Sequence, residues 1–249
     1  MRTRIGVIAD IHGNAFTLRQ ILADLEGEQV DTIICLGDVA VLGPDPSGVV
    51  RELRGREIVT VLGNTDAWLL GTHSVPVEPP ESEIAIALTA WTREQLAPEE
   101  RSWLANLPVA WSTSITGVQV HAYHATPDSV DADVRDHLFG EQHRPTLAIC
   151  AHTHNQCLRP LGRGWLLNPG SAGLPGVGPG FAGLVQHERA TWVEYAIVDV
   201  ASAIDMAIHL KRRPVDFPQM ILWARAFPMP EMDWWIGRWG ATADAGRLV

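Results

Sequence analysis

Aspartate and histidine side chains follow short apolar runs at several points of this sequence. The first group is Asp10-Ile11-His12, directly after the apolar run 5–9. On an extended chain, a carboxylate and an imidazole two residues apart lie on one side, because successive side chains of a strand alternate. Such a pair supplies half of a site for a divalent metal ion. Taken alone, this pair could also be a helix cap formed by Asp10 with His12 packed beside it. The later groups therefore decide the interpretation.

Two aspartates, one asparagine and four histidines stand at the ends of strand-like runs: Asp10, His12, Asp38, Asn64, His124, His152 and His154. Each histidine alone would be interpreted as an ordinary hydrogen-bonded residue, but the repeated placement favours a site. The set exceeds what one tetrahedral zinc ion needs. It fits two ions such as Mn²⁺, Fe or Zn²⁺ that share a carboxylate. We assign the shared carboxylate to Asp38, which ends the second and, we expect, central strand.

Alternating strands and helices are expected to bring these groups to one edge of a sheet. Strands are predicted over 5–9, 32–36 and 57–62, with a helix over 15–25 capped by Asn14 and another capped by Ser47. This order predicts right-handed βαβ units and a parallel sheet. Functional groups gather beyond the carboxyl ends of such strands.

The rest of the chain is expected to complete one domain, 1–249, with a helical insert over about 68–108 and a C-terminal appendage over about 200–249. The spacing of apolar residues from Ala203 to Leu210 predicts a helix capped by Asp199. The other predicted elements are helices over 83–96, from Pro98 and over 134–139, hairpins over 109–123 and 181–198, and strands over 146–150 and 165–167.

The tail is rich in tryptophan: Trp223, Trp234, Trp235 and Trp239. These rings could form a stacking platform for a base or sugar. An apolar cover for the domain, or a surface for homo-oligomer formation, is the favoured interpretation.

Charge and cysteine content limit the environment and the partners of the protein. Lys plus Arg number 19 and Asp plus Glu 29, so the net charge is −10, which does not favour strong nucleic-acid binding. The three cysteines, Cys35, Cys150 and Cys157, lack metal-type spacing and fit buried residues of a reducing compartment. No apolar run approaches the ~20 residues that span a bilayer. We therefore expect a soluble cytoplasmic protein without a membrane partner.

The segments 10–12, 37–38, 63–66, 124 and 151–154 resemble, in their order, the motifs of the calcineurin-like metallophosphoesterase superfamily. Asn168-Pro169-Gly170-Ser171 also resembles the small bacterial and archaeal phosphodiesterase-like branch. The resemblance implies an α/β fold, a four-layer α-β-β-α sandwich of two mixed sheets with the helical insert and a helical C-terminal tail.

The resemblance also implies how the metal ligands divide. One metal would take Asp10, His12, Asp38 and His154, and the other would take Asp38, Asn64, His124 and His152, with solvent between the ions. Manganese is the first expectation, with Fe, Zn, Ni or Co as alternatives. Two positions depart from the family. Thr65 stands where the family often has a histidine that protonates the leaving group, and Ala151 stands where a glycine is usual. Asp66, which would orient that histidine, is retained.

Hydrolysis of a small phosphomonoester or phosphodiester is the function that this set predicts, with Asp38, Asn64 and Asp66 in catalytic roles. Two cations ~3.5–4 Å apart lower the pKa of bound water and orient phosphoryl oxygens. Asn168, Gly170 and Ser171 are predicted to contact substrate, although a turn set by Pro169 and Gly170 is an equal alternative. Two other functions stay open at this point: a metal-stabilised binding or regulatory scaffold with little catalysis, and a phosphoprotein phosphatase.

Overall fold

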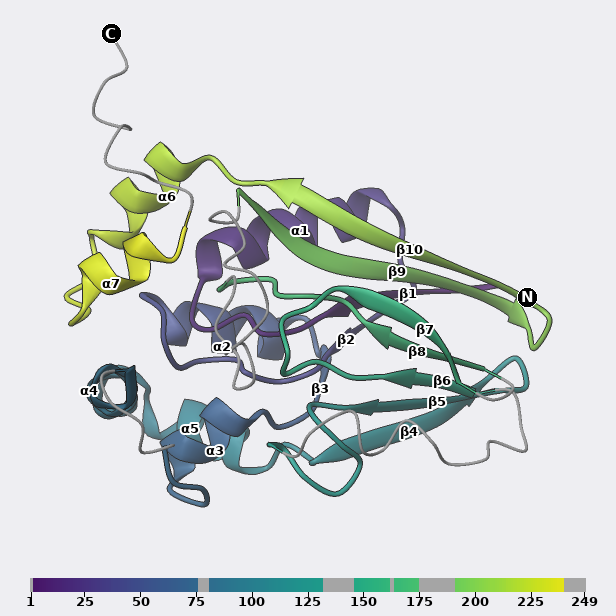
Figure 1. Cartoon of the computed structure of the whole chain (residues 1–249), viewed down its shortest axis with the longest axis horizontal. Coiled ribbons are helices and arrows are strands. Elements are labelled where there is room, and N and C mark those ends of the chain that lie inside the picture. The colour runs from purple at the N-terminus through teal and green to yellow at the C-terminus, as the bar shows by residue number, and fades with distance from the viewer. Residues whose placement is uncertain (1, 76–80, 132–145, 162–163, 175–190, 240–249) are drawn as a thin grey trace, which may run out of the picture.

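Two five-stranded sheets stacked face to face form the centre of the protein (Figure 1). The computed structural model describes residues 2–75, 81–131, 146–161, 164–174 and 191–239. In order across the first sheet, the strands are β10 (Asp205–Pro214), β9 (Trp192–Ser202), β1 (Thr3–Ile8), β2 (Thr32–Cys35) and β3 (Val59–Thr60). In the second sheet they are β4 (Ala110–Ile115), β5 (Val118–Tyr123), β6 (Thr146–Ile149), β8 (Gly164–Asn168) and β7 (Cys157–Leu161).

Both sheets are mixed. β1, β2 and β3 run parallel to one another, as do β5, β6 and β8. β9, β10, β4 and β7 add antiparallel pairs. The predicted parallel pairing and the sandwich of two mixed sheets with flanking helices are therefore confirmed. The expectation that the second strand is central was wrong, since β1 holds the middle of the first sheet and β2 lies beside it.

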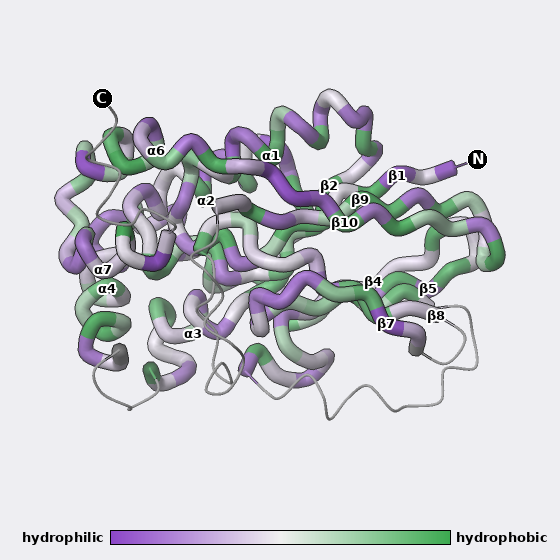
Figure 2. Tube along the Cα trace, turned by 45° about the horizontal axis from the view of Figure 1, so that its top comes forward, coloured by the Kyte–Doolittle hydropathy of each residue, from purple (hydrophilic) through white to green (hydrophobic). Residues whose placement is uncertain are grey.

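Apolar side chains fill the space between the sheets. Ile5 and Val7 of β1 are fully buried against residues of the second sheet such as Val120 and Ile149. The intervening strand positions face the other way, and Ile8 belongs to a separate cluster with the helices. Side chains of a strand alternate faces, so β1 contributes to both apolar clusters. Figure 2 shows hydrophobic residues in the strands of both sheets, with hydrophilic residues interspersed.

Helices α1 (Ala15–Gly27) and α2 (Pro46–Gly55) cover the outer face of the first sheet. Asn14 caps α1 as predicted, because its side chain accepts a hydrogen bond from the Thr17 amide. The predicted Ser47 cap was wrong. Asp45 caps α2 by accepting a bond of 2.8 Å from the Gly48 amide, whereas the Ser47 hydroxyl donates to Glu100.

The insert between β3 and β4 is helical, as predicted. It contains α3 (Asn64–Leu70), α4 (Glu81–Gln95) and α5 (Pro98–Ala105). Pro98 occupies the first turn of α5, and the Glu100 carboxylate accepts a bond from the Ala97 amide there. A proline is tolerated at this position because its missing amide hydrogen would have had no helical partner.

The helix predicted from Ala203 to Leu210 was wrong. β9 continues to Ser202, and β10 pairs with it in antiparallel register. Met206 and Ile208 point towards the apolar layer between the sheets, so the residues follow a period of two. Short apolar runs satisfy helix and strand periods alike, and the neighbouring strand decided the outcome. β7 was not predicted, and the predicted helix over 134–139 and strand over 181–185 lie outside the described residues.

The C-terminal part of the chain contributes α6 (Phe217–Ala224) and α7 (Met232–Gly237). The side chains of Trp235 and Trp239 are fully buried and join the apolar cluster that includes α1 and α2. This placement agrees with an apolar cover for the domain, while self-association through the tail stays a prediction. Among the described residues, no helix is long and apolar enough to cross a membrane.

Candidate metal centre

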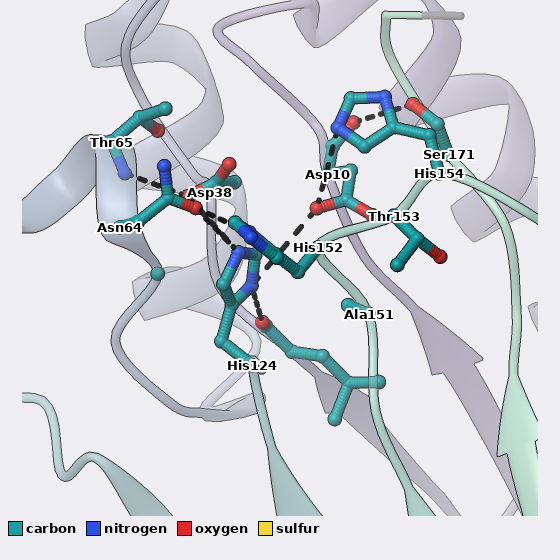
Figure 3. Close-up of polar contacts among 12 residues, drawn as sticks. Asp10, Asp38, Asn64, Thr65, His124, Ala151, His152, Thr153, His154 and Ser171 are labelled. Carbon is teal, nitrogen blue, oxygen red and sulfur yellow. Dashed lines mark hydrogen bonds and ion pairs between the residues drawn. The ribbon is translucent and has the colours of Figure 1, made fainter. Parts of the chain in front are cut away.

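The seven predicted metal ligands lie at the carboxyl ends of strands from both sheets, and all of them except His12 are labelled in Figure 3. Asp10 and His12 follow β1, Asp38 follows β2, Asn64 begins α3, His124 follows β5, and His152 and His154 follow β6. All seven side chains are buried. Asp10, His12, Asp38 and His154 each offer one donor atom, and these four atoms lie within 4.8 Å of one another.

Left-handed backbone conformations aim these side chains. Positive φ angles between 48° and 66° occur at Asp10, His12, Asp38, His152 and His154. The expectation that an extended chain aligns Asp10 with His12 was therefore wrong, since β1 ends at Ile8 and a turn brings the two together. Asp and His tolerate this region better than most residues, but each such residue still costs of order 1–3 kcal/mol. The surrounding contacts must supply that free energy.

The turn that carries Asp38 packs directly on the start of α3. A Cβ atom added at Gly63 would lie 2.2 Å from Oδ1 of Asp38, so glycine is required there. The Thr65 amide donates to the same oxygen at 2.9 Å. The Asp66 carboxylate accepts hydrogen bonds from the amides of Val39, Ala40 and Gly63. In this structure Asp66 therefore holds the Asp38 turn against α3.

Backbone carbonyls fix the orientation of three histidine rings. Nδ1 of His12, His124 and His154 lies within hydrogen-bond distance of a carbonyl oxygen: Val41 at 3.1 Å, Leu36 at 2.7 Å and Leu174 at 2.7 Å, respectively. A carbonyl only accepts, so each Nδ1 must carry the proton. Each Nε2 then faces the cluster. This is the arrangement in which a histidine binds a metal through one nitrogen while the other is held by a hydrogen bond.

Burial favours the neutral form of two of these rings. Burial lowers the pKa of His12 and of His154, although the charge of Asp38 opposes the shift at both. Their Nε2 atoms lie 3.2 Å apart, and in neutral rings protonated at Nδ1 neither can donate to the other. Donor atoms bound about 2.0–2.1 Å from one cation would lie roughly 3 Å from each other. The pair thus fits a shared cation.

The two aspartates of the donor set have opposite pKa shifts. Burial and the charge of Asp38 raise the pKa of Asp10 well above its ordinary value. Burial also opposes ionisation of Asp38, but His124 and His12 lower its pKa to about 2. Both carboxylate oxygens of Asp10 are buried, and among the described residues neither has a hydrogen-bond partner at the usual distance, although the backbone of His152 is close enough to oppose the rise in pKa. A divalent cation would satisfy these oxygens, so the donor set fits a metal ion.

Asp38 lies between the two halves of the cluster. Its Oδ2 is 3.4 Å from Nε2 of His12, and its Oδ1 is 3.5 Å from Nε2 of His124. In the second half, Oδ1 of Asn64 lies 2.9 Å from Nε2 of His124 and 2.9 Å from Nδ1 of His152. One carboxylate therefore faces donor atoms on both sides, and Figure 3 shows the side formed by Asn64 and His124.

Comparison with known proteins places this arrangement in a family. The model of the calcineurin-like phosphoesterase superfamily domain matches residues 3–202. The chain belongs to the calcineurin-like phosphoesterase superfamily. Within this superfamily, the buried cluster of Asp10, His12, Asp38 and His154 is compatible with a bound divalent cation.

Similar proteins come from bacteria and archaea. An uncharacterised protein of Methanocaldococcus jannaschii is 27% identical over 195 residues, which cover 70% of this phosphoesterase chain and 78% of the relative. The crystal structure of a metallophosphoesterase from Sphaerobacter thermophilus has a TM-score of 0.68 at 22% identity and covers 96% of this chain and 98% of that one. The crystal structure of a hypothetical protein from Pyrococcus horikoshii has a TM-score of 0.72 at 17% identity and covers 97% of this chain and 100% of that one. These two structures confirm the metallophosphoesterase fold.

The residues predicted to contact substrate are engaged inside this phosphoesterase domain. Nδ2 of Asn168 donates to the Ala151 carbonyl at 2.9 Å and to the Thr153 hydroxyl at 3.1 Å, and Oδ1 accepts from the Gly170 amide. The Ser171 hydroxyl is bonded to backbone groups. These bonds agree with the alternative of a structural turn, and substrate contact by the three residues stays a prediction.

Several groups that build the centre could not be found from sequence. The carbonyl oxygens that orient the histidines belong to Val41, Leu36 and Leu174, and the amide that holds Asp38 belongs to Thr65. Every residue has these backbone groups, so residue type contains no signal for their role.

Proposed function

We propose that this chain is a phosphoesterase that hydrolyses small phosphodiesters or phosphomonoesters with the help of two divalent cations. Membership of the calcineurin-like phosphoesterase superfamily supports a hydrolase. The observation that carries the proposal is the convergence of seven buried donor side chains from both sheets on one place, with Asp38 between the two halves. A scaffold that had lost catalysis should also have lost some of these ligands, so the complete donor set argues against that alternative.

Each cation would be held by four side chains. Asp10, His12, Asp38 and His154 would hold one, and Asp38, Asn64, His124 and His152 the other. Manganese suits this mixture of oxygen and nitrogen donors, as do Fe, Zn, Ni and Co. When bound, such a pair supplies water of lowered pKa and neutralises charge on the phosphoryl group.

The protein residues contribute by being oriented in advance. The carbonyls of Leu36, Val41 and Leu174 fix three imidazole rings, and the Thr65 amide fixes one oxygen of Asp38. Groups that are already in place need no reorganisation during the reaction, and this saving is a major part of electrostatic catalysis.

Thr65 limits the choice of substrate. Its hydroxyl is buried beside Asp38 and Asn64 and lacks a hydrogen-bond partner among the described residues. A threonine hydroxyl does not act as an acid near neutral pH, and protonation of a leaving group typically contributes about 10²–10⁴-fold. We therefore propose that esters with good leaving groups, and diesters in particular, react faster than alkyl monoesters.

Elemental analysis and a substrate panel test the proposal together. Protein purified without chelator should contain close to two transition-metal ions per chain. With added Mn²⁺ it should hydrolyse an aryl phosphodiester and an aryl monoester faster than an alkyl monoester. Absence of turnover on the whole panel with Mn²⁺, Co²⁺, Ni²⁺ and Zn²⁺ would refute the enzyme and favour the scaffold.

A further inference from the structure

Residues 168–174, here called the bracing loop, connect the two segments that carry most of the donor side chains. Its first residue, Asn168, bonds to the Ala151 carbonyl beside His152. Its last residue, Leu174, accepts a hydrogen bond from Nδ1 of His154 at 2.7 Å. The middle of the loop runs along Asp10. The loop therefore spans the gap between the β1 turn and the turn after β6.

Backbone bonds dock the bracing loop on the β1 turn. The Ala172 amide donates to the Ala9 carbonyl at 2.8 Å, and the Gly173 amide donates to the Asp10 carbonyl at 3.1 Å. The approach is so close that a Cβ atom at Gly173 would lie 1.7 Å from the carbonyl oxygen of Ile11. Only glycine permits this contact, so the position of the loop relative to Asp10 is tightly defined.

One side chain, Ser171, links the last residue of the bracing loop to the turn after β1. Its hydroxyl oxygen lies 2.9 Å from the carbonyl oxygen of Asp10 and 2.8 Å from that of Leu174, and it accepts a bond from the Leu174 amide at 3.0 Å. The first carbonyl belongs to a donor residue, and the second orients the His154 ring. Ser171 is buried, so little water can replace these bonds if the hydroxyl is removed.

The bracing loop is also supported from its far side. The Glu194 amide donates to the Ser171 carbonyl at 2.9 Å. Nε2 of Gln156 lies 3.0 Å from the Pro169 carbonyl oxygen. Because β9 and the start of β7 hold the loop in this way, a lost bond at Ser171 would release the turn of Asp10 and the ring of His154 rather than the whole loop.

We infer that Ser171 is a positioning residue for the half of the centre formed by Asp10, His12, Asp38 and His154. Its hydroxyl sets the relative position of Asp10 and His154, and so the affinity of this half for a cation. In the other half, Leu36 orients His124, and among the described residues no hydrogen bond of Ser171 reaches that ring or Asn64. This inference rests on the proposed pair of cations.

Variants that lack one cation site allow the effect of Ser171 on each half of the centre to be measured separately. In an Asn64→Ala background, the remaining cation site is the one that Ser171 supports. Adding Ser171→Ala there should weaken Mn²⁺ binding about 10–100-fold, the usual effect of removing a group that orients a metal ligand. In a His12→Ala background, the same change should alter Mn²⁺ affinity less than about twofold, because the Ser171 hydroxyl bonds to Asp10 and Leu174 and not to the ligands of the remaining half. Calorimetric titration of the full, metal-free chain measures both.

Two matched variants show whether a loss of Mn²⁺ affinity comes from general destabilisation of the fold. Ser171→Thr keeps a hydroxyl and should restore binding in the Asn64→Ala background. Ser47→Ala removes another serine hydroxyl, which bonds Glu100 between α2 and α5, and should leave Mn²⁺ affinity unchanged. If Ser171→Ala does not fold by circular dichroism, Ser171→Cys replaces it, because a thiol of similar size donates weakly and should weaken the same half.

The inference is overturned if Ser171→Ala leaves Mn²⁺ affinity unchanged in the Asn64→Ala background, or weakens binding equally in both backgrounds. The wild-type titration separates this failure from that of the proposed function. If the wild-type chain binds two cations and Ser171→Ala leaves Mn²⁺ affinity unchanged, the role of Ser171 is refuted and the proposed function is not. A wild-type chain that binds no pair of cations refutes the proposed function, and the inference with it.

Discussion

Nε2 of His12 and Nε2 of His154 face each other at 3.2 Å, although neither has a proton to donate. Carbonyl oxygens of Val41 and Leu174 hold the only ring proton of each at Nδ1, and burial lowers the pKa of both imidazoles. Two lone pairs aimed at each other repel unless a positive charge lies beside them. This relationship is a strong physical argument for a cation in this half of the centre.

Cation binding should release protons near neutral pH. The pKa of Asp10 is raised by burial and by Asp38, and the pKa of Asp66 is raised by the same two causes to about 7. Both groups therefore hold protons above the ordinary pKa of an aspartate in the metal-free protein. A cation must displace the proton of its ligand Asp10, and its positive charge favours ionisation of the nearby Asp66. Burial lowers the pKa values of His12 and His154, so these rings contribute fewer released protons than ordinary imidazoles would. Affinity should thus rise with pH from about 4 to at least 7.

Calorimetry in buffers of different ionisation enthalpy measures this release. We expect about one to two protons per chain at pH 6 on saturation with Mn²⁺. Asp66→Asn should lower the number, because this residue then has no proton to lose. Release of no protons at pH 6 would show that Asp10 and Asp66 are already ionised, contrary to the expected shifts.

Replacing Asp38 should affect both halves of the centre. Asp38→Ala removes the oxygens that face His12 and His124, so both cations should bind more weakly. We expect kcat/KM on an aryl phosphodiester to fall by at least about 10²-fold, the scale of losing one preorganised electrostatic group. Asp24→Ala, which removes a carboxylate paired with Arg213 outside the centre, is the control. Full activity of Asp38→Ala would contradict the shared role.

A histidine at position 65 should change substrate preference. Thr65→His would supply the acid that this position lacks, and turnover of an alkyl phosphomonoester should rise by about tenfold or more, a part of the 10²–10⁴-fold that acid catalysis gives. The added rate should decline as pH rises above the pKa of the new imidazole, because only its protonated form donates.

Thr65→Val separates acid catalysis from a change of shape. Valine keeps the size of threonine without its hydroxyl, so it should bring no gain on the alkyl monoester. An equal gain in the valine and histidine variants would remove protonation of the leaving group as the explanation.

The C-terminal helices should contribute to stability. Trp235 of α7 is fully buried in the cluster that includes α1, so Trp235→Ala should lower the free energy of unfolding by about 3–5 kcal/mol. Leu222 of α6 is 77% exposed, and Leu222→Ala should change it by no more than about 0.5 kcal/mol. Chemical denaturation measures both. Equal effects would indicate that the tail does not cover the domain.

The sequence by itself determined the type and order of the donor residues. Asp10, Asp38 and Asn64 each follow a run with strand character, and parallel strands joined by helices must end at one edge of a sheet. Chain order and periodicity are local properties, so they could be interpreted without coordinates. The helix caps at Asn14 and the start of α5 at Pro98 were predictable for the same reason.

Only the tertiary structure decided how the donor atoms are aimed. Left-handed turns at Asp10 and His12, and carbonyls of distant residues such as Leu174, fix each side chain. The strand over 205–214 likewise depended on its neighbour, because Met206 and Ile208 fit either a helix or a strand until β9 lies beside them. These outcomes depend on long-range contacts between backbone groups that every residue possesses, and residue type alone does not encode them.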